Sequence, residues 1–171
     1  GPVGMSALLT AQFYSPAEII MIDLDDSRLE MSRKFGATKT INSSDGNAVE
    51  RIMELTDGRG VDVAIEAVGI PATFDLCQQM LAPGGRLANV GVHGKSVELR
   101  LEKLWIHNIT ITTGLVSTST TPMLLKTVQA NRLQPSRLIT HRFPLSEIMK
   151  AYEVFKNAGK EHALKVILYN D

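Results

Sequence analysis

A glycine turn and one acid further along the chain are the residues whose spacing predicts chemistry. Gly1-Pro2-Val3-Gly4 fits the last four positions of the pattern G-x-G-x-x-G, and a helical pattern follows directly. Asp23 comes roughly 20 residues later, at the end of the apolar run 18–23. A helix N-terminus holds phosphate groups through its free N–H groups, and an acid after the next strand accepts hydrogen bonds from ribose hydroxyls. The spacing therefore predicts a dinucleotide site, with Gly4 where a side chain would hold helix and strand apart.

Asp23 also bears on which dinucleotide binds. A carboxylate repels a 2′-phosphate and accepts a hydrogen bond from a free 2′-hydroxyl, which favours NAD over NADP. Arg28 lies about one helical turn further on, where it could pair with a 2′-phosphate or contact the ribose edge beside Asp23. We expect NAD, with NADP as the less favoured cofactor.

Two later strand ends carry glycine where a flat ligand would lie. The segments Glu66–Gly69 (EAVG) and Asn89–Val92 (NVGV) each close an apolar strand pattern. Ligands of parallel α/β sheets bind at the carboxyl ends of the strands, and glycine lets the backbone approach them closely. The other interpretation, ordinary glycines between strand and loop, stays open for each segment.

Helical and strand patterns alternate along the chain. Helices are expected at 4–14, 26–36, 47–60, 71–83, 120–133 and 145–159, and strands or extended segments at 18–25, 61–69, 86–94, 108–115, 138–145 and 162–171. Such alternation with short connections predicts an α/β fold with a doubly wound, Rossmann-like parallel sheet. The Thr- and Ser-rich stretch 114–122 is either a loop lining a site or a domain boundary.

The composition excludes several classes of function. The chain has 18 Lys and Arg residues against 18 Asp and Glu residues, so the basic excess of nucleic-acid or acidic-membrane binders is absent. The only cysteine, Cys77, can form neither an internal disulfide nor a Cys-rich zinc site. We expect a cytoplasmic protein that binds neither nucleic acid nor membranes.

The ordered set of these patterns resembles the coenzyme-binding domain of zinc-dependent medium-chain alcohol dehydrogenases of the bacterial type. The segments that carry the resemblance are 1–4, 19–38, 60–69, 81–94, 109–128 and 138–155. It implies an NAD-binding Rossmann-like domain at 1–140, and a C-terminal helix and strand at 141–171 that return toward a catalytic domain. The expected substrate of the parent enzyme is a small alcohol or carbonyl compound.

The resemblance also implies roles for single residues. The pyrophosphate would face Gly1, Pro2, Val3 and Gly4, and the adenosine ribose would bind Asp23 with Arg28 alongside. The adenine and its ribose would pass near Ala67, Val68 and Gly69. The nicotinamide would be lined by Val90, Gly91, Val92, Gly114 and Leu115. Lys165 would contact the pyrophosphate, or it is simply an exposed lysine on a strand.

One feature of the resembled family is missing from the sequence. In that family a separate N-terminal domain holds the catalytic zinc, and none of His93, His107, His141 and His162 has metal-ligand spacing here. We therefore expect no catalytic and no metal-binding residues, and a fragment that is inactive alone. A threonine or sugar-alcohol dehydrogenase fragment, a non-catalytic nucleotide-binding module and a methyltransferase remain the alternatives. Strand 108–115 is a plausible sheet edge for a homo-oligomer.

The first strand of the fold is expected to be absent, because the chain begins at the turn that follows it. That strand is central in the order 3-2-1-4-5-6. Three explanations are open: the chain is part of a longer one, its strands rearrange, or another chain fills the gap.

Overall fold

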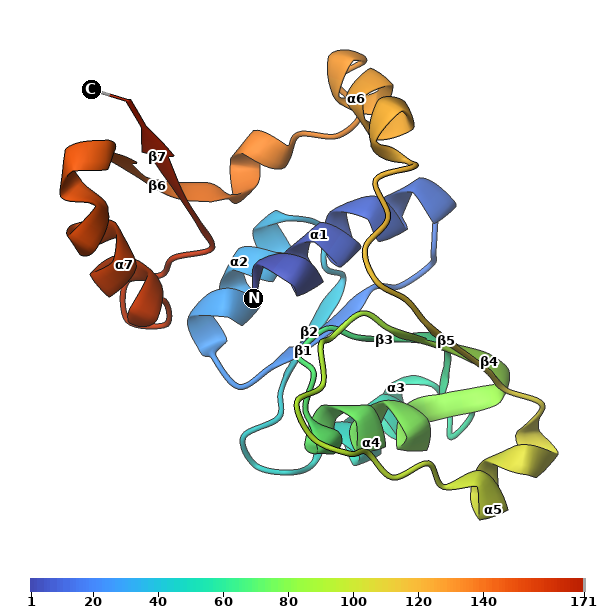
Figure 1. The fold of residues 1–171 in the computed structure, drawn as a ribbon. Helices are drawn as coiled ribbons and strands as arrows, with labels where there is room; N and C mark the ends of the chain where they lie inside the picture. Colours follow the sequence, from blue (N-terminus) through green and yellow to red (C-terminus); the bar gives the residue numbers. More distant parts are fainter. Residues whose placement is uncertain (171) are drawn as a thin grey trace. The chain divides into compact units, whose positions relative to one another are not determined.

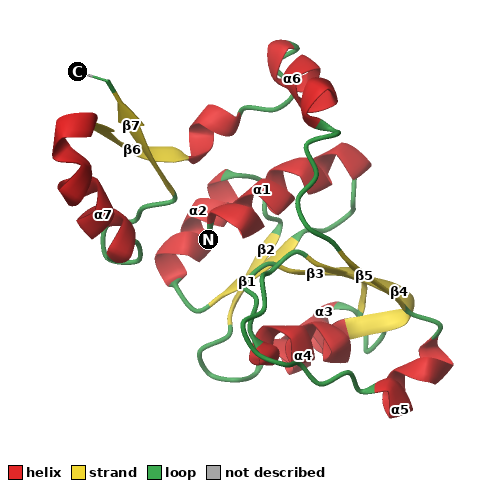
Figure 2. Cartoon of the chain, viewed as in Figure 1, coloured by secondary structure: helices red, strands yellow, loops and turns green. Residues whose placement is uncertain are grey.

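The computed structural model describes residues 1–170, which form two compact units (Figure 1). One unit combines residues 1–40 with the segment from 117 onward, and the other comprises residues 41–116. Helices and strands alternate in both (Figure 2). None of the helices within residues 1–170 has both the length and the apolar character of a membrane span.

The first unit begins with a helix that carries much of its core. Its N-terminal elements are α1 (Pro2–Ala11), the short turn η1 (Gln12–Tyr14), β1 (Ile20–Asp23) and α2 (Asp26–Lys34); β2 (Lys39–Asn42), which pairs with β1, crosses into the second unit. Three residues of one face of α1 are buried: Met5, Leu8 and Leu9. They cluster with Phe35, Leu138 and Leu164, so the two sequence-distant parts of this unit share one hydrophobic core.

The C-terminal part of the first unit is a parallel strand pair with a helix in its connection. Its elements are α6 (Thr121–Gln129), η3 (Pro135–Leu138), β6 (Ile139–Pro144), η4 (Leu145–Glu147), α7 (Ile148–Lys156) and β7 (Lys165–Tyr169). β6 and β7 pair in parallel, and α7 packs on both. Arg137 ties this part to α2: its Nη2 donates to the Lys34 carbonyl at 2.6 Å, and its guanidinium lies 4.7 Å from the centre of the Phe35 ring.

The second unit is a three-stranded parallel sheet with helices on it. It contains α3 (Ala48–Leu55), β3 (Val61–Glu66), α4 (Pro71–Met80), β4 (Leu81–Asn89), α5 (Leu101–Leu104), η2 (Trp105–His107) and β5 (Thr110–Thr113), with the strands in the order β3-β4-β5. Helix α4 packs on β3 and β4. The buried residues Ala64 and Glu66 alternate along β3 with the more exposed Val63 and Ile65, as expected where one sheet face is covered.

The predicted α/β class with parallel strands is confirmed, but one strand was not predicted and the ends of several elements differ from the predicted ones. β2 was not predicted from the sequence. The helix predicted at 71–83 ends earlier, since α4 ends at Met80 and β4 already begins at Leu81, where Val61 of β3 pairs with Leu81. The helix expected at 47–60 ends at Leu55, since the chain turns at Asp57 and Gly58, both of which have positive φ.

The strands form separate sheets instead of one continuous sheet. Within residues 1–170, β1 pairs with β2, and β3 pairs with β4, which pairs with β5, but no pairing joins β1 to β3.

Candidate functional site

The N-terminus of α1 lies beside the predicted ribose-binding acid. Gly1 is the N-cap of α1, Pro2 opens the helix, and no side chain caps it. The amino nitrogen of Gly1 lies 3.5 Å from Oδ2 of Asp23. The first N–H groups of a helix have no partner within the helix, so α1 presents donors and a partial positive charge next to this carboxylate.

Asp23 is held at the end of β1 by the backbone that follows it. The amides of Leu24 and Asp25 donate to Oδ1 of Asp23 at 2.8 and 3.2 Å. Arg28 Nη1 lies 3.8 Å from the same oxygen, and the side chains of Asp23 and Arg28 are 23% and 32% exposed. The structure thus brings Gly1, Asp23 and Arg28 together, with the carboxylate still accessible.

A helix cap explains why Arg28 lies there. Oδ1 of Asp25 accepts hydrogen bonds from the Ser27 amide at 2.8 Å, the Ser27 hydroxyl at 2.6 Å and the Arg28 amide at 3.4 Å. These bonds, the Ser27 hydroxyl first, hold the pKa of the Asp25 carboxyl below its ordinary value. Asp25 therefore caps α2, which begins at Asp26, and places Arg28 in its first turn.

Two other predicted coenzyme residues of the first unit, Gly4 and Lys165, make few close contacts. A side-chain carbon on Gly4 would make only an ordinary contact with Cε of Met21, at 3.8 Å. The close packing that we expected at Gly4 is therefore not present within residues 1–170, because only the tip of a flexible methionine faces it. Lys165 begins β7 opposite Ile139, and its side chain is exposed.

In the second unit, three parallel strands end at the same level. Glu66 of β3 is paired with Asn89 of β4, which is paired with Thr113 of β5. The segments that follow these positions therefore leave one edge of the sheet. They contain the predicted coenzyme residues of this unit: Ala67, Val68, Gly69, Val90, Gly91, Val92, Gly114 and Leu115.

The loops after β3 and β4 touch each other. The amides of Val90 and Gly91 both donate to the Glu66 carbonyl, at 2.8 and 3.1 Å. Gly69 has a φ of +85°, and a side-chain carbon there would overlap the Val92 carbonyl. Glycine is required at residue 69 for both reasons.

Glu66 lies beneath these loops and was not among the predicted site residues. It is only 1% exposed, and its Oε1 accepts hydrogen bonds from the Val68 and Gly69 amides, both at 2.9 Å, and from the Thr73 hydroxyl at 2.6 Å. Burial alone would raise the pKa of Glu66, but these bonds and His93 outweigh it, so the pKa lies below its ordinary value. An acid closing an apolar strand was the available signal in the sequence.

His93 connects the second loop to this carboxylate. Its Nε2 lies 2.8 Å from Oδ1 of Asn89 and 3.4 Å from Oε2 of Glu66. Both neighbours are acceptors, so this nitrogen carries a hydrogen. The Phe74 ring meets the imidazole edge to face at 5.8 Å, and Nδ1 has no hydrogen-bond partner among residues 1–170.

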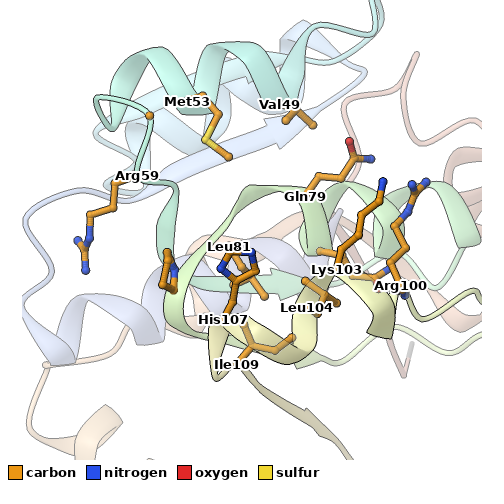
Figure 3. A pocket seen from close by; sticks show the side chains of 13 residues that line it. Val49, Met53, Arg59, Gln79, Leu81, Arg100, Lys103, Leu104, His107 and Ile109 are labelled. Carbon is orange, nitrogen blue, oxygen red and sulfur yellow. Dashed lines mark hydrogen bonds between the residues drawn. The ribbon is translucent and has the colours of Figure 1, made fainter.

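A separate pocket of about 420 Å³ lies in the second unit (Figure 3). Met53 of α3, Gln79 of α4 and Lys103 of α5 line it. Arg100 at its wall is engaged with Asp75, with Nε–Oδ1 at 2.5 Å and Nη2–Oδ2 at 2.9 Å. Leu81, the first residue of β4, also lines the pocket, whereas the predicted coenzyme loop follows the last residue of that strand. The pocket is therefore distinct from the predicted coenzyme loops of this unit.

The amino-acid sequence matches a known protein family over most of the chain. A family model described as zinc-binding dehydrogenase matches residues 2–130. The chain belongs to the zinc-binding dehydrogenase family. Its members include an alcohol dehydrogenase of Cupriavidus necator, which is 34% identical over 98% of this chain and 47% of its own length. A relative from Thermoanaerobacter brockii, named an NADP-dependent isopropanol dehydrogenase, is 32% identical over 98% of this chain and 50% of its own length.

A solved structure of the same family is more similar still. The apo form of zinc-dependent alcohol dehydrogenase 2 from Streptococcus pneumonia is 63% identical, with a TM-score of 0.96 over 100% of this chain and 50% of that one. The chain spans about half the length of the relatives it matches.

The zinc that names this family does not fit the described residues. No group of three His, Cys, Asp or Glu side chains within residues 1–170 is placed to hold a metal ion. Burial raises the pKa of the Cys77 thiol to about 12, whereas a cysteine ligand must be a thiolate. We derive no zinc-dependent step from these residues.

Proposed function

We propose that this chain is the coenzyme-binding part of an NAD-dependent alcohol dehydrogenase. The observation that carries the proposal is the accessible Asp23 carboxylate, whose Oδ2 lies 3.5 Å from the amino nitrogen of Gly1, the N-cap of α1. A helix N-terminus and an adjacent acid supply what a dinucleotide needs, donors for its phosphates and an acceptor for its ribose.

The proposed residue roles fall within each unit by itself. In the first, Gly1, Pro2, Val3 and Gly4 would hold the pyrophosphate, with Lys165 as a further cation, and Asp23 and Arg28 would bind the adenosine ribose. In the second, the loop 67–69 would pass the adenine and its ribose, and the loops 90–92 and 114–115 would line the nicotinamide. Bound NAD would supply a hydride acceptor, and the residues of this chain would bind and orient it.

The choice of NAD over NADP rests on the charge around Asp23. A 2′-phosphate beside this carboxylate would be repelled, and Arg28, at 3.8 Å from Asp23, is already directed to it. Family membership does not decide the question, because one relative is named NADP-dependent. The proposal therefore predicts a preference that can be measured directly.

The alcohol specificity and the zinc chemistry would reside outside the described residues. The proposed NAD-binding domain covers residues 1–140, with 141–171 returning toward a catalytic domain. On this view the 171-residue chain binds coenzyme but does not oxidise alcohol by itself. We further propose a homo-oligomer that uses the outer edge of β5, which has no strand paired to it among residues 1–170.

Calorimetric titration of the chain with NADH, NADPH and S-adenosylmethionine tests the proposal. We expect NADH to bind more tightly than NADPH, and S-adenosylmethionine not to bind. Asp23→Asn should weaken NADH binding about tenfold, because it removes one charged hydrogen bond. It should also reduce the preference for NADH over NADPH. Glu30→Gln, an exposed acid of α2, is the matched control and should change neither affinity. Absent NADH binding, or equal NADH affinity in wild type and Asp23→Asn, would contradict the proposal.

A further inference from the structure

Glu66 is a buried charged residue at the base of two of the three proposed coenzyme loops of the second unit. We propose that Glu66 is a positioning residue that fixes the loops 67–69 and 90–93 against each other in the conformation that receives the coenzyme. This inference rests on the proposed function, since it assigns a task at the same site. Glu66 itself, at 1% exposed, does not reach the coenzyme.

The first loop is shaped around the Glu66 carboxylate. Oε1 receives the amides of Val68 and Gly69 at 2.9 Å each, and Oε2 lies 3.1 Å from the Gly69 amide. Thr73, in the first turns of α4, donates to Oε1 at 2.6 Å. Consecutive amides that converge on one carboxylate fold the backbone tightly around it, so the course of residues 67–69 depends on this acceptor.

The second loop is held by the same residue through different atoms. The backbone oxygen of Glu66 accepts from Val90 and Gly91, while Oε2 faces Nε2 of His93 at 3.4 Å. A side-chain carbon on Gly91 would overlap Oε2, so the loop packs directly on the carboxylate. One residue therefore sets the position of both loops.

The geometry requires a carboxylate and not merely a polar side chain. Both oxygens face N–H groups: Oε1 those of Val68 and Gly69, and Oε2 those of Gly69 and His93. Glutamine has almost the same shape, but its amide nitrogen is a donor and would face one of these N–H groups. An apolar residue would leave buried amides without an acceptor, which is also unfavourable.

Glu66→Gln is therefore the informative variant, studied in the whole 171-residue chain. Amide hydrogen exchange followed by NMR reports whether the loops loosen, without any coenzyme. We expect exchange at Val68 and Gly69 to become about tenfold faster, and NADH affinity to fall about tenfold. Thr73→Val removes one donor but keeps the charge, and should weaken NADH binding only about threefold. This second variant keeps the proposal testable if Glu66→Gln does not fold.

Two controls separate positioning from loss of stability. Glu54→Gln makes the same charge change on the exposed surface of α3 and should alter neither readout. Leu87→Val trims a fully buried side chain of β4 and should lower the unfolding temperature while leaving NADH affinity of the folded chain unchanged.

The outcomes distinguish this inference from the proposed function. Wild type that binds no NADH overturns the proposed function and the coenzyme role of Glu66 with it. Wild type that binds NADH, with equal affinity in Glu66→Gln, overturns the positioning role alone. Faster exchange without a change in affinity shows a merely structural residue and also overturns it.

Discussion

Gly91 packs directly against Glu66, so that a side-chain carbon at residue 91 would overlap both Oε2 of Glu66 and the amide nitrogen of Gly69. Gly91→Ala should therefore push the two loops apart and destabilise the folded chain by about 1–3 kcal/mol, as expected for overpacking. NADH affinity should fall with it. Urea unfolding and an NADH titration measure the two effects.

Gly94 provides the control for this prediction. It lies three residues after Gly91, and apart from its chain neighbours no heavy atom of residues 1–170 lies within 4 Å of where its side-chain carbon would stand. Gly94→Ala should leave stability and affinity nearly unchanged. Equal effects of the two substitutions would show that the packing at Gly91 is not the cause.

The lowered pKa of Glu66 predicts a loss of stability in acid. In the folded chain, the hydrogen bonds that Glu66 accepts, together with the nearby His93, keep the Glu66 carboxyl ionised at pH values below its ordinary pKa of about 4.3. In the unfolded chain the same carboxyl takes up a proton at those pH values. The contribution of Glu66 is thus fully present above that ordinary value and is lost as the pH falls through the lower folded-state pKa.

Urea unfolding between pH 6 and pH 3 measures this dependence. The free energy of unfolding of wild type should fall more steeply toward acid than that of Glu66→Gln, which has no proton to take up at this position. Parallel curves for the two proteins would contradict the assignment.

The Cys77 thiol should be unreactive in the folded chain. Burial raises the pKa of the thiol to about 12, so the thiolate fraction at pH 8 is only about 10⁻⁴. In an ordinary cysteine the thiolate fraction at the same pH is roughly a quarter. Alkylation by iodoacetamide should be about 10³-fold slower in the native chain than in urea. Because Cys77 is the only cysteine, mass spectrometry reads this site alone. Native labelling at the rate of the denatured chain would refute the prediction.

The Asp25 cap should contribute measurably to stability. Asp25→Ala removes the acceptor for the first amides of α2 and should lower the free energy of unfolding by about 1 kcal/mol. Asp25→Ser keeps a side-chain acceptor and should restore most of the loss. If alanine and serine behave alike, the cap does not stabilise α2.

Local patterns were sufficient to predict most elements of this protein. Each of these patterns lies within a short stretch of chain: the capping acid of α2, the apolar spacing of α1 and the interval from Gly4 to Asp23. The order of such patterns along the chain indicated the family and the α/β class. β2 escaped prediction, because Lys39–Asn42 has no apolar run and becomes a strand only by pairing with β1. The start of β4 was hidden for a similar reason, since Pro83 and Gly84 resemble a turn until Leu81 is seen opposite Val61.

The sequence alone determined that an acid follows a glycine turn at the interval of a dinucleotide site, because strand length, helix length and charge are properties of neighbouring residues. Only the tertiary structure decided that Glu66 and His93 meet beneath two loops, and that the chain lacks a pairing between β1 and β3 within residues 1–170. Hydrogen bonds between strand ends depend on register across the sheet, and no spacing along one strand specifies which residue of another it will face.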